Sequence, residues 1–83
     1  MYYIVYSSIT FATGIKNKFR YDPEPITVLH TPSGISKGGC SYSIAVKTAS
    51  KALEIIKASE DYGVKVKGLY KQTDSENFEE LEY

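Results

Sequence analysis

The sequence predicts an α+β fold of the ferredoxin-like type, a two-layer sandwich with two helices on one face of a four-stranded antiparallel sheet. The first observation is the order of the predicted elements, which is βαββαβ. The second is the length of 83 residues, which allows one domain with a single core. Helices segregated to one side of an antiparallel sheet, joined by right-handed crossovers, then give the spatial strand order 4-1-3-2. This fold does not by itself indicate a function.

The first half of the chain predicts a strand, a helix and a second strand. Residues 2–6 are β-branched or aromatic throughout, which is typical of a buried strand. Ser7 or Ser8 then offers the N-cap of a helix. This helix carries an apolar stripe at helical spacing, formed by Phe11, Ile15 and Phe19. Two prolines end it before a second strand at residues 26–30.

The second half predicts a loop, a strand, a helix and a last strand. Residues 31–39 are rich in glycine, serine and proline, which indicates a loop. Residues 41–47 alternate with period two, which puts three apolar side chains on one face: Tyr42, Ile44 and Val46. A second helix follows between a capping threonine and Gly63, and residues 64–70 form the fourth strand.

The net charge of zero is the sum of two opposite parts. Residues 1–71 hold all ten bases against five acids, a net charge of +5, whereas residues 72–83 hold five acids and no base, a net charge of −5. We therefore expect a single domain at residues 1–71 and an acidic tail at 72–83, which forms a short helix through Phe78 and Leu81 or frays. A basic body beside an acidic tail disfavours nucleic acid as a partner without excluding it.

Composition also excludes several classes of protein. A single cysteine cannot form an internal disulfide, and one cysteine with one histidine falls short of a usual zinc ligand set. No apolar run approaches the ~20 residues needed to span a bilayer, and the N-terminus lacks the basic region of a signal peptide. No phosphate-binding loop or dinucleotide fingerprint is present. We expect a cytoplasmic protein with no metal, no cofactor and no membrane partner.

Cys40 is the candidate functional residue. In the expected strand order, the start of the third strand lies beside the end of the first, where the first helix begins. Cys40 would then lie near Ser8 and the N-terminal N–H groups of that helix, which favour a thiolate. Lys37 adds positive charge from the same loop, and His30 at the end of the second strand is a candidate proton partner. The alternative is that a lone cysteine is a small buried apolar side chain with no chemistry.

Five motifs run along most of the chain: the Tyr-Ile-Val-Tyr strand, the Thr31-Pro32 turn, Ile35-Ser36 followed by Gly39-Cys40, the strand at 42–46, and the ending at 62–70. Through them, roughly residues 3–71 resemble a family of small prokaryotic proteins described as selenium/sulfur-carrier-like. The sequence departs from the family pattern at Ser33, at Ser41 and in the spacing from Ser36 to Cys40. The resemblance implies a thiol that accepts and hands on sulfur or selenium, with Cys40 as the carrier.

The first hypothesis is therefore a sulfur or selenium carrier in which Cys40 forms a persulfide or selenenylsulfide. Lys37 and the N–H groups near Ser8 would stabilise the anion, and His30 would be the proton partner. Such a protein is more a carrier than a stand-alone enzyme. The chemistry needs a donor of the cysteine desulfurase type and an acceptor protein.

The second hypothesis is a binding module that uses the open face of the sheet. By parity that face carries a tyrosine among lysines, namely Tyr3, Lys47, Lys65 and Lys67. Aromatic and basic side chains on a sheet can stack and hold single-stranded nucleic acid. A protein partner or a homodimer could use the same half-apolar face. Lysines on a solvated face are also an ordinary feature of soluble sheets.

Overall fold

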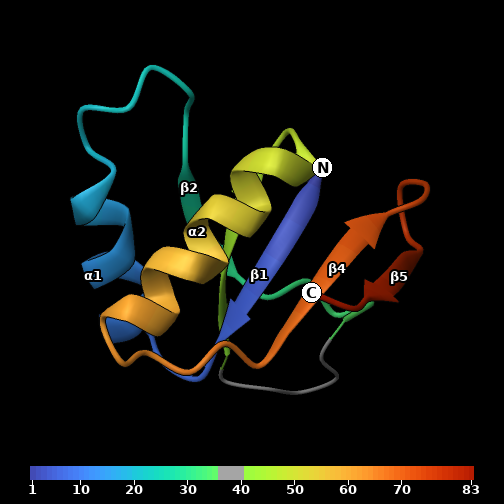
Figure 1. Cartoon of the computed structure of the whole chain (residues 1–83). Coiled ribbons are helices and arrows are strands. Elements are labelled where there is room, and N and C mark those ends of the chain that lie inside the picture. Colours follow the sequence, from blue (N-terminus) through green and yellow to red (C-terminus); the bar gives the residue numbers. More distant parts are fainter. Residues whose placement is uncertain (36–40) are drawn as a thin grey trace.

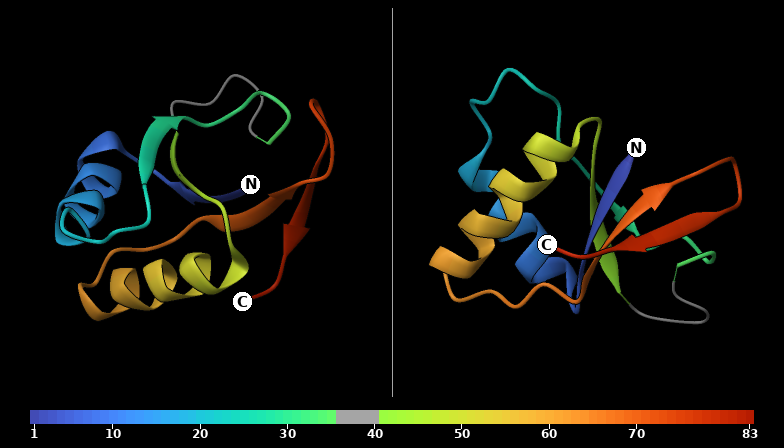
Figure 2. Two further views of the ribbon diagram at one scale, coloured as in Figure 1. Left: turned by 90° about the horizontal axis from the view of Figure 1, so that it is seen from above. Right: turned by 45° about the vertical axis from the view of Figure 1, so that its right-hand side comes forward.

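The computed structural model describes residues 1–35 and 41–83, which form two helices and a five-stranded antiparallel sheet (Figure 1). Both helices lie on the same side of the sheet (Figure 2). The predicted α+β class is therefore confirmed. The elements follow in the order β1 (Tyr2–Tyr6), α1 (Ile9–Lys18), β2 (Thr27–His30), β3 (Tyr42–Val46), α2 (Ala49–Asp61), β4 (Gly68–Gln72) and β5 (Phe78–Leu81).

Each helix begins at a hydroxyl side chain that accepts a backbone N–H. Ser8 Oγ accepts the N–H of Phe11 at 3.3 Å. Thr48 Oγ1 accepts the N–H of Lys51 at 3.2 Å. Both caps were predicted from the sequence and are confirmed. In each, a side-chain oxygen accepts a hydrogen bond from a backbone N–H that has no partner within the helix. After α2 the chain turns at Gly63, whose φ of +72° favours glycine.

The strand order is β2-β3-β1-β4-β5, and all neighbouring strands are antiparallel. Four of these strands reproduce the expected 4-1-3-2 order. Tyr6 at the end of β1 pairs with Tyr42 at the start of β3. The start of β3 therefore lies beside the turn into α1, as the topology predicted.

The fifth strand is the main departure from the predicted fold. We expected residues 72–83 to form a short helix or to fray, and this was wrong, because they include β5, which forms a hairpin with β4. The Asp74 carboxylate holds the turn, since its Oδ1 accepts the N–H groups of Glu76 and Asn77, each at 3.0 Å. An acidic residue of the tail is thus part of the turn.

The spacing of Phe78 and Leu81 explains why a helix was expected. Side chains three residues apart share one face of a helix but lie on opposite faces of a strand. Here Leu81 packs against the core below the helices, and Phe78 packs against Tyr3 on the other face of the sheet. As a strand, this segment packs one apolar side chain on each face of the sheet, whereas a helix would place both side chains on the same face.

β4 begins at Gly68 and not at residue 64, as we had predicted. Residues 64–67 cross from α2 to the sheet. The first of them is bonded to α2, where its N–H donates to the carbonyl of Ser59 at 2.8 Å. Contact with β1 begins only where the N–H of Lys67 donates to the carbonyl of Val5, also at 2.8 Å. The alternation of valine and lysine here reflects packing under α2 more than a strand.

The core lies between the helices and one face of the sheet. Alternate residues of β1 and β3 point into it and are fully buried, as the period-two pattern predicted: Ile4, Tyr6, Ile44 and Val46. The helices add five buried side chains: Ala12, Ile15, Ala52, Ile55 and Ile56. The predicted stripe of the first helix was wrong at Phe11, which is 42% exposed.

Tyr6 brings a hydroxyl group into this core. Its oxygen lies 2.7 Å from Ser59 Oγ, which also lies 2.9 Å from the Ile55 carbonyl and donates to it. Because serine has one hydroxyl proton, Tyr6 is the donor to Ser59. Burial raises the pKa of Tyr6 to about 12, and the hydrogen bond to Ser59 offsets a part of this rise.

Candidate functional site

Cys40 and Lys37, the predicted carrier thiol and its cationic neighbour, lie in residues 36–40, outside the described residues. The described residues on either side of this segment are Ile35 and Ser41. The contacts of these two residues define the described surroundings of the candidate site.

Ile35 and Ser41 line one pocket of about 190 Å³ together with Val5, Lys67 and Tyr70. Val5 and Tyr70 alternate with core residues of β1 and β4, so the pocket lies on the sheet face opposite the helices. Ser41 is only 4% exposed, and its Oγ has no hydrogen-bond partner among the described residues. A buried hydroxyl without a partner costs free energy, so a ligand group that hydrogen-bonds to it gains affinity. Lys67 supplies the cation of the pocket.

Residues 31–35 cover this second face of the sheet, on the side away from the helices (Figure 2). The hydroxyl of Thr31 lies 2.8 Å from that of Ser43 in β3. The β4–β5 hairpin meets the same segment, because a Cβ atom at Gly34 would lie 2.7 Å from the ring of Phe78. Two segments far apart in the sequence thus pack together over the sheet.

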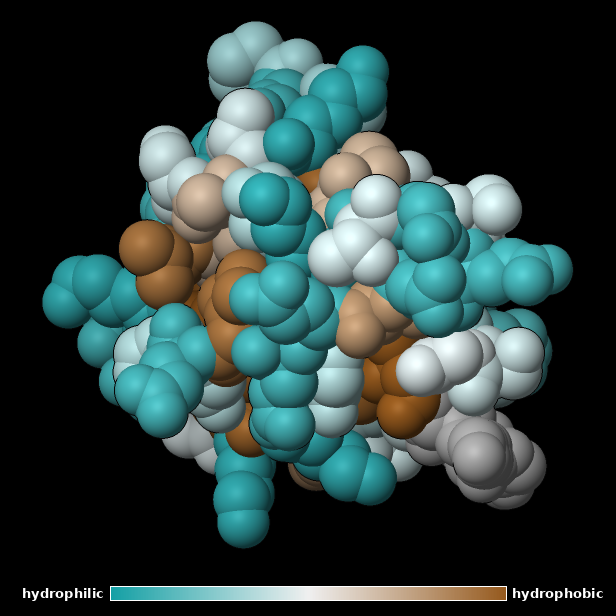
Figure 3. All heavy atoms as spheres, turned by 90° about the vertical axis from the view of Figure 1, so that its right-hand side faces the viewer, coloured by the Kyte–Doolittle hydropathy of each residue, from teal (hydrophilic) through white to brown (hydrophobic). Residues whose placement is uncertain are grey.

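The sheet face expected to be open is consequently covered at Tyr3. The Tyr3 side chain is 9% exposed, its ring meets Phe78 edge-on at 5.4 Å between centroids, and its hydroxyl donates to Gln72 at 3.3 Å. Lys47 and Lys65 are exposed but lie outside β3 and β4. On the side that carries the hairpin, apolar side chains form separate patches among polar ones (Figure 3). The structure therefore does not assemble the predicted stacking surface.

His30 lies apart from the pocket at Ser41. It ends β2 opposite Tyr42, with the two ring centroids 4.5 Å apart, and its side chain is exposed. It shares parity with Val28, which packs against the core, so it belongs to the helix side of the sheet. Among the described residues, His30 and Lys67 do not form one cluster.

Ser8 lies at the N-terminus of α1, where the sequence predicted it. Its side chain accepts the N–H of Phe11, and its carbonyl accepts the N–H of Ala12 at 3.2 Å. The pairing of Tyr6 with Tyr42 puts this end of the helix beside the start of β3. Its predicted neighbour, the Cys40 thiol, lies outside the described residues.

Residues 1–71 match the model of one protein family, which is described as "Putative Se/S carrier protein-like". The chain belongs to this family. The match includes Cys40 and ends within β4, so β5 lies beyond it. No curated protein and no solved structure matches the chain.

In residues 1–35 and 41–83, no group of three or more histidine, cysteine, aspartate and glutamate side chains is arranged to hold a metal ion. Neither α1 nor α2 has the length and hydropathy that a membrane-spanning helix requires.

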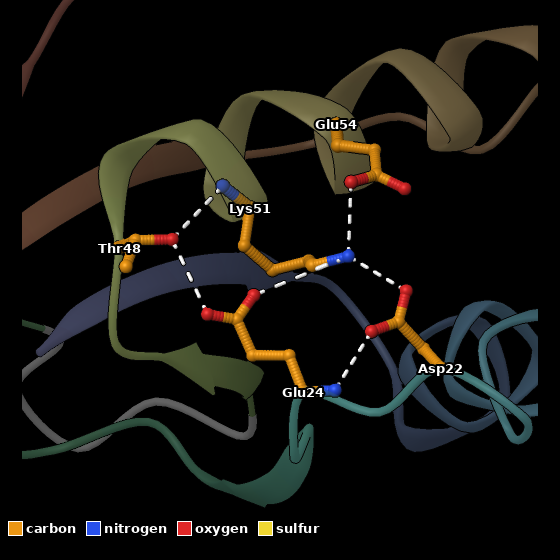
Figure 4. Close-up of polar contacts among 5 residues, drawn as sticks. All are labelled: Asp22, Glu24, Thr48, Lys51 and Glu54. Carbon is orange, nitrogen blue, oxygen red and sulfur yellow. Dashed lines mark hydrogen bonds and ion pairs between the residues drawn. The ribbon is translucent and has the colours of Figure 1, made fainter.

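The ion pairs in the described part of the chain all involve Lys51 in α2 (Figure 4). Its Nζ lies 2.7 Å from Asp22, 2.9 Å from Glu54 and 4.0 Å from Glu24. The hydrogen bonds to Asp22 and then to Glu54 raise the pKa of Lys51 to about 12, and the bond from Lys51 lowers the pKa of Asp22. This cluster joins the connection between α1 and β2 to α2, and none of its residues lines the pocket at Ser41.

Sequence reasoning missed Ser41 and Tyr70 as neighbours in one pocket. Their parity was available, since Ser41 alternates with Tyr42 and Tyr70 alternates with Leu69. What the sequence lacked was a signal that residues 31–35 fold over this face. That arrangement depends on contacts with the hairpin, which was itself not predicted.

Proposed function

We propose that this chain carries sulfur or selenium on Cys40, as a persulfide or selenenylsulfide. Membership of the Se/S carrier-like family is the observation that supports this most directly, and Cys40 is the only cysteine of the sequence. The protein acts as a relay and not as a stand-alone enzyme, because it needs a donor and an acceptor. A cytoplasmic location suits this role, since thiols stay reduced there.

Loading is a transfer between two thiols. The Cys40 thiolate attacks the terminal sulfur of a persulfide on a donor of the cysteine desulfurase type. A new bond forms between Cys40 Sγ and that sulfur, the S–S bond of the donor breaks, and the donor leaves as a thiolate with the bonding electron pair. No external oxidant or reductant is needed. Delivery repeats the step with an acceptor nucleophile and Cys40 as the leaving thiolate, and terminal selenium follows the same course.

The anion on Cys40 needs positive partners. We assign this role to Lys37 in the same loop and to the N-terminal N–H groups of α1 next to the Ser8 cap. Both would lower the pKa of a thiol close to them. His30, which is exposed at the end of β2, is assigned as the proton partner.

The pocket at Ser41 supports a further partner for the thiol. Ser41 is bonded covalently to Cys40 and lines the same pocket as Lys67. A lysine ammonium close to a thiol favours the thiolate, and a buried serine hydroxyl can donate a hydrogen bond to a sulfur anion. Lys67 and Ser41 are therefore an alternative set of partners for Cys40, on the sheet face opposite His30 and the helices.

The pH dependence of Cys40 alkylation by iodoacetamide tests this proposal, because only one thiol can react. We expect an apparent pKa well below the ordinary value of ~8.5. Lys67→Ala should raise this pKa, whereas Lys47→Ala should leave it unchanged, since Lys47 is an exposed lysine outside the pocket. An ordinary thiol titration in the parent protein would overturn the activated thiol. Equal effects of the two lysine variants would remove Lys67 from the site.

A further inference from the structure

We propose that a groove between α1 and the end of α2 binds a nucleoside phosphate, with the base on a tyrosine ring and the phosphate held by Lys18 and Arg20. The groove has a volume of about 510 Å³, within the range of small-molecule sites. It is lined by Gly14, Asn17, Lys18, Arg20, Tyr21 and Tyr62. It belongs to the helix layer, whereas the pocket at Ser41 lies on the other face of the sheet.

Two exposed tyrosines give the groove its aromatic character. Tyr21 is 87% exposed and Tyr62 is 58% exposed, although large aromatic side chains usually gain by burial. Stacking of a base on such a ring is sequence-tolerant, because every base has a π face. The two rings therefore offer a surface that suits a nucleobase.

The two cations of the groove lie over these rings. Lys18 Nζ is 3.8 Å from the ring centroid of Tyr62, and Arg20 Cζ is 5.0 Å from that of Tyr21. A contact with a π face orients a cation without using its N–H donors on a carboxylate. Because every ion pair in the described part of the chain involves Lys51, Lys18 and Arg20 keep donors for a phosphate.

The distribution of charge favours an anion at this end of the molecule. Residues 1–21 contain three bases and no acid. The next two acids, Asp22 and Glu24, pair with Lys51 (Figure 4). The five acids of the tail follow β4, and the β4–β5 hairpin lies on the side of the molecule away from α1 (Figure 1). Glu60 and the last residue of α2 are acidic but do not line the groove.

Gly14 leaves the groove open. It lies inside α1, where glycine is a weaker helix former than alanine, and a Cβ atom at this position would meet nothing within 4 Å. A larger side chain would therefore fit on the helix and fill the groove. Gly14→Leu is for this reason a variant that blocks the site while improving the helix.

Amide chemical shifts in NMR titrations with AMP and with a short single-stranded oligoadenylate test the proposal. We expect shifts at the amides of Gly14, Asn17 and Tyr62. Arg20→Ala should weaken binding about five-fold or more, since the loss of one charge-assisted phosphate contact changes the dissociation constant by about this factor. Gly14→Leu should abolish binding and raise the thermal stability. Lys57→Ala, at an exposed lysine outside the groove, should bind as the parent does.

The two probes distinguish the source of the ligand. Shifts with AMP alone identify a free nucleotide, and tighter binding of the oligoadenylate that falls with added salt identifies a single-stranded nucleic acid. The proposal is overturned if neither probe moves these amides, or if Gly14→Leu binds as the parent does. It is also overturned if a polyglutamate peptide moves them and both nucleotide probes do not.

Discussion

At the scale of single residues, Tyr6 shows how the core tolerates a polar group. Its hydroxyl donates to Ser59, which passes a hydrogen bond on to the carbonyl of Ile55. Tyr6→Phe removes one donor but leaves the Ser59 bond to Ile55 in place. We therefore expect a loss of about 1 kcal/mol in the free energy of unfolding at neutral pH.

The raised pKa of Tyr6 gives this residue a signature at alkaline pH. Between pH 10 and 12 the phenol ionises in the unfolded chain but stays protonated in the folded one. The folded state then binds more protons, so stability falls as pH rises, by up to ~1.4 kcal/mol per pH unit for one group. Urea unfolding of the parent protein over this range should show a steeper loss than unfolding of Tyr6→Phe.

Tyr21→Phe is the matched control for this measurement, because Tyr21 is 87% exposed. It should lose stability with the same slope as the parent. A parent and a Tyr6→Phe variant with identical slopes would contradict the assignment of the buried phenol.

At the scale of elements, the β4–β5 hairpin and the segment at residues 31–35 approach each other closely at Gly34. A Cβ atom at Gly34 would lie 2.7 Å from the Phe78 ring and 3.0 Å from the carbonyl oxygen of Glu76. Gly34→Ala should therefore destabilise the protein by about 1–3 kcal/mol, as overpacking does. Phe78→Ala removes the ring, so the double variant should lose less than the sum of the two single losses.

Chemical denaturation of the four proteins in this cycle measures the coupling. Gly14→Ala is the control substitution, because its Cβ has open space in a helix and should stabilise by about 0.5–1 kcal/mol. Strictly additive losses for Gly34→Ala and Phe78→Ala would contradict a close contact between the hairpin and residues 31–35.

The same elements show how far sequence reasoning could go. β1 and β3 follow from period-two alternation and β-branched content, and both helix starts follow from Ser8 and Thr48. These signals depend on neighbouring residues only, so the elements can be predicted from them without knowledge of the fold. β5 was missed because the spacing of Phe78 and Leu81 suits a helix face as well as two faces of a sheet. The strand is favoured because β4 would otherwise have an unpaired edge, which a sequence pattern alone does not reveal.

The candidate site divides in the same way. Cys40 and the glycines before it stand out by composition, and the place of the start of β3 beside the end of β1 follows from topology. The pocket at Ser41 could not be predicted, because it needs residues 31–35 to fold over the sheet against Phe78. The stacking surface around Tyr3 was predicted on the premise of an open face, which this long-range packing removes.

At the scale of the whole molecule, Lys51 joins the helix layer to the chain that enters β2. Lys51→Met keeps the apolar stem but leaves Asp22, Glu24 and Glu54 facing one another without a cation. We expect a lower melting temperature. The lowered pKa of Asp22 stabilises the fold above pH 3.8 and the raised pKa of Lys51 stabilises it below pH 10.5, so the loss should be largest between these values.

Thermal unfolding of Lys51→Met across this pH range makes the test, with Lys57→Met as control. Lys57 is exposed on the same helix and forms none of the ion pairs described here. The two variants should differ most near neutral pH and converge in acid. Equal losses in both would contradict a stabilising role for the cluster.

The carrier site and the nucleotide groove are separate proposals, because none of the residues that line the groove lines the pocket at Ser41. The proposed carrier residue, Cys40, directly precedes Ser41 in the sequence, and the groove proposed for a nucleoside phosphate lies between α1 and the end of α2. The net charge of zero conceals an uneven distribution along the chain. Residues 1–21 hold three bases and no acid, whereas the five acids of residues 72–83 lie in and after the β4–β5 hairpin. This hairpin is on the side of the molecule away from α1 (Figure 1).

Sulfur loading of Cys40 is the measurement that tests the central claim most directly. The protein is incubated with a cysteine desulfurase and L-cysteine, and its intact mass is determined before and after treatment with dithiothreitol. The parent protein should gain the mass of one sulfur atom and lose it on reduction, whereas Cys40→Ser should gain nothing. No gain in the parent protein, or an equal gain in Cys40→Ser, would contradict the role of Cys40 as a carrier.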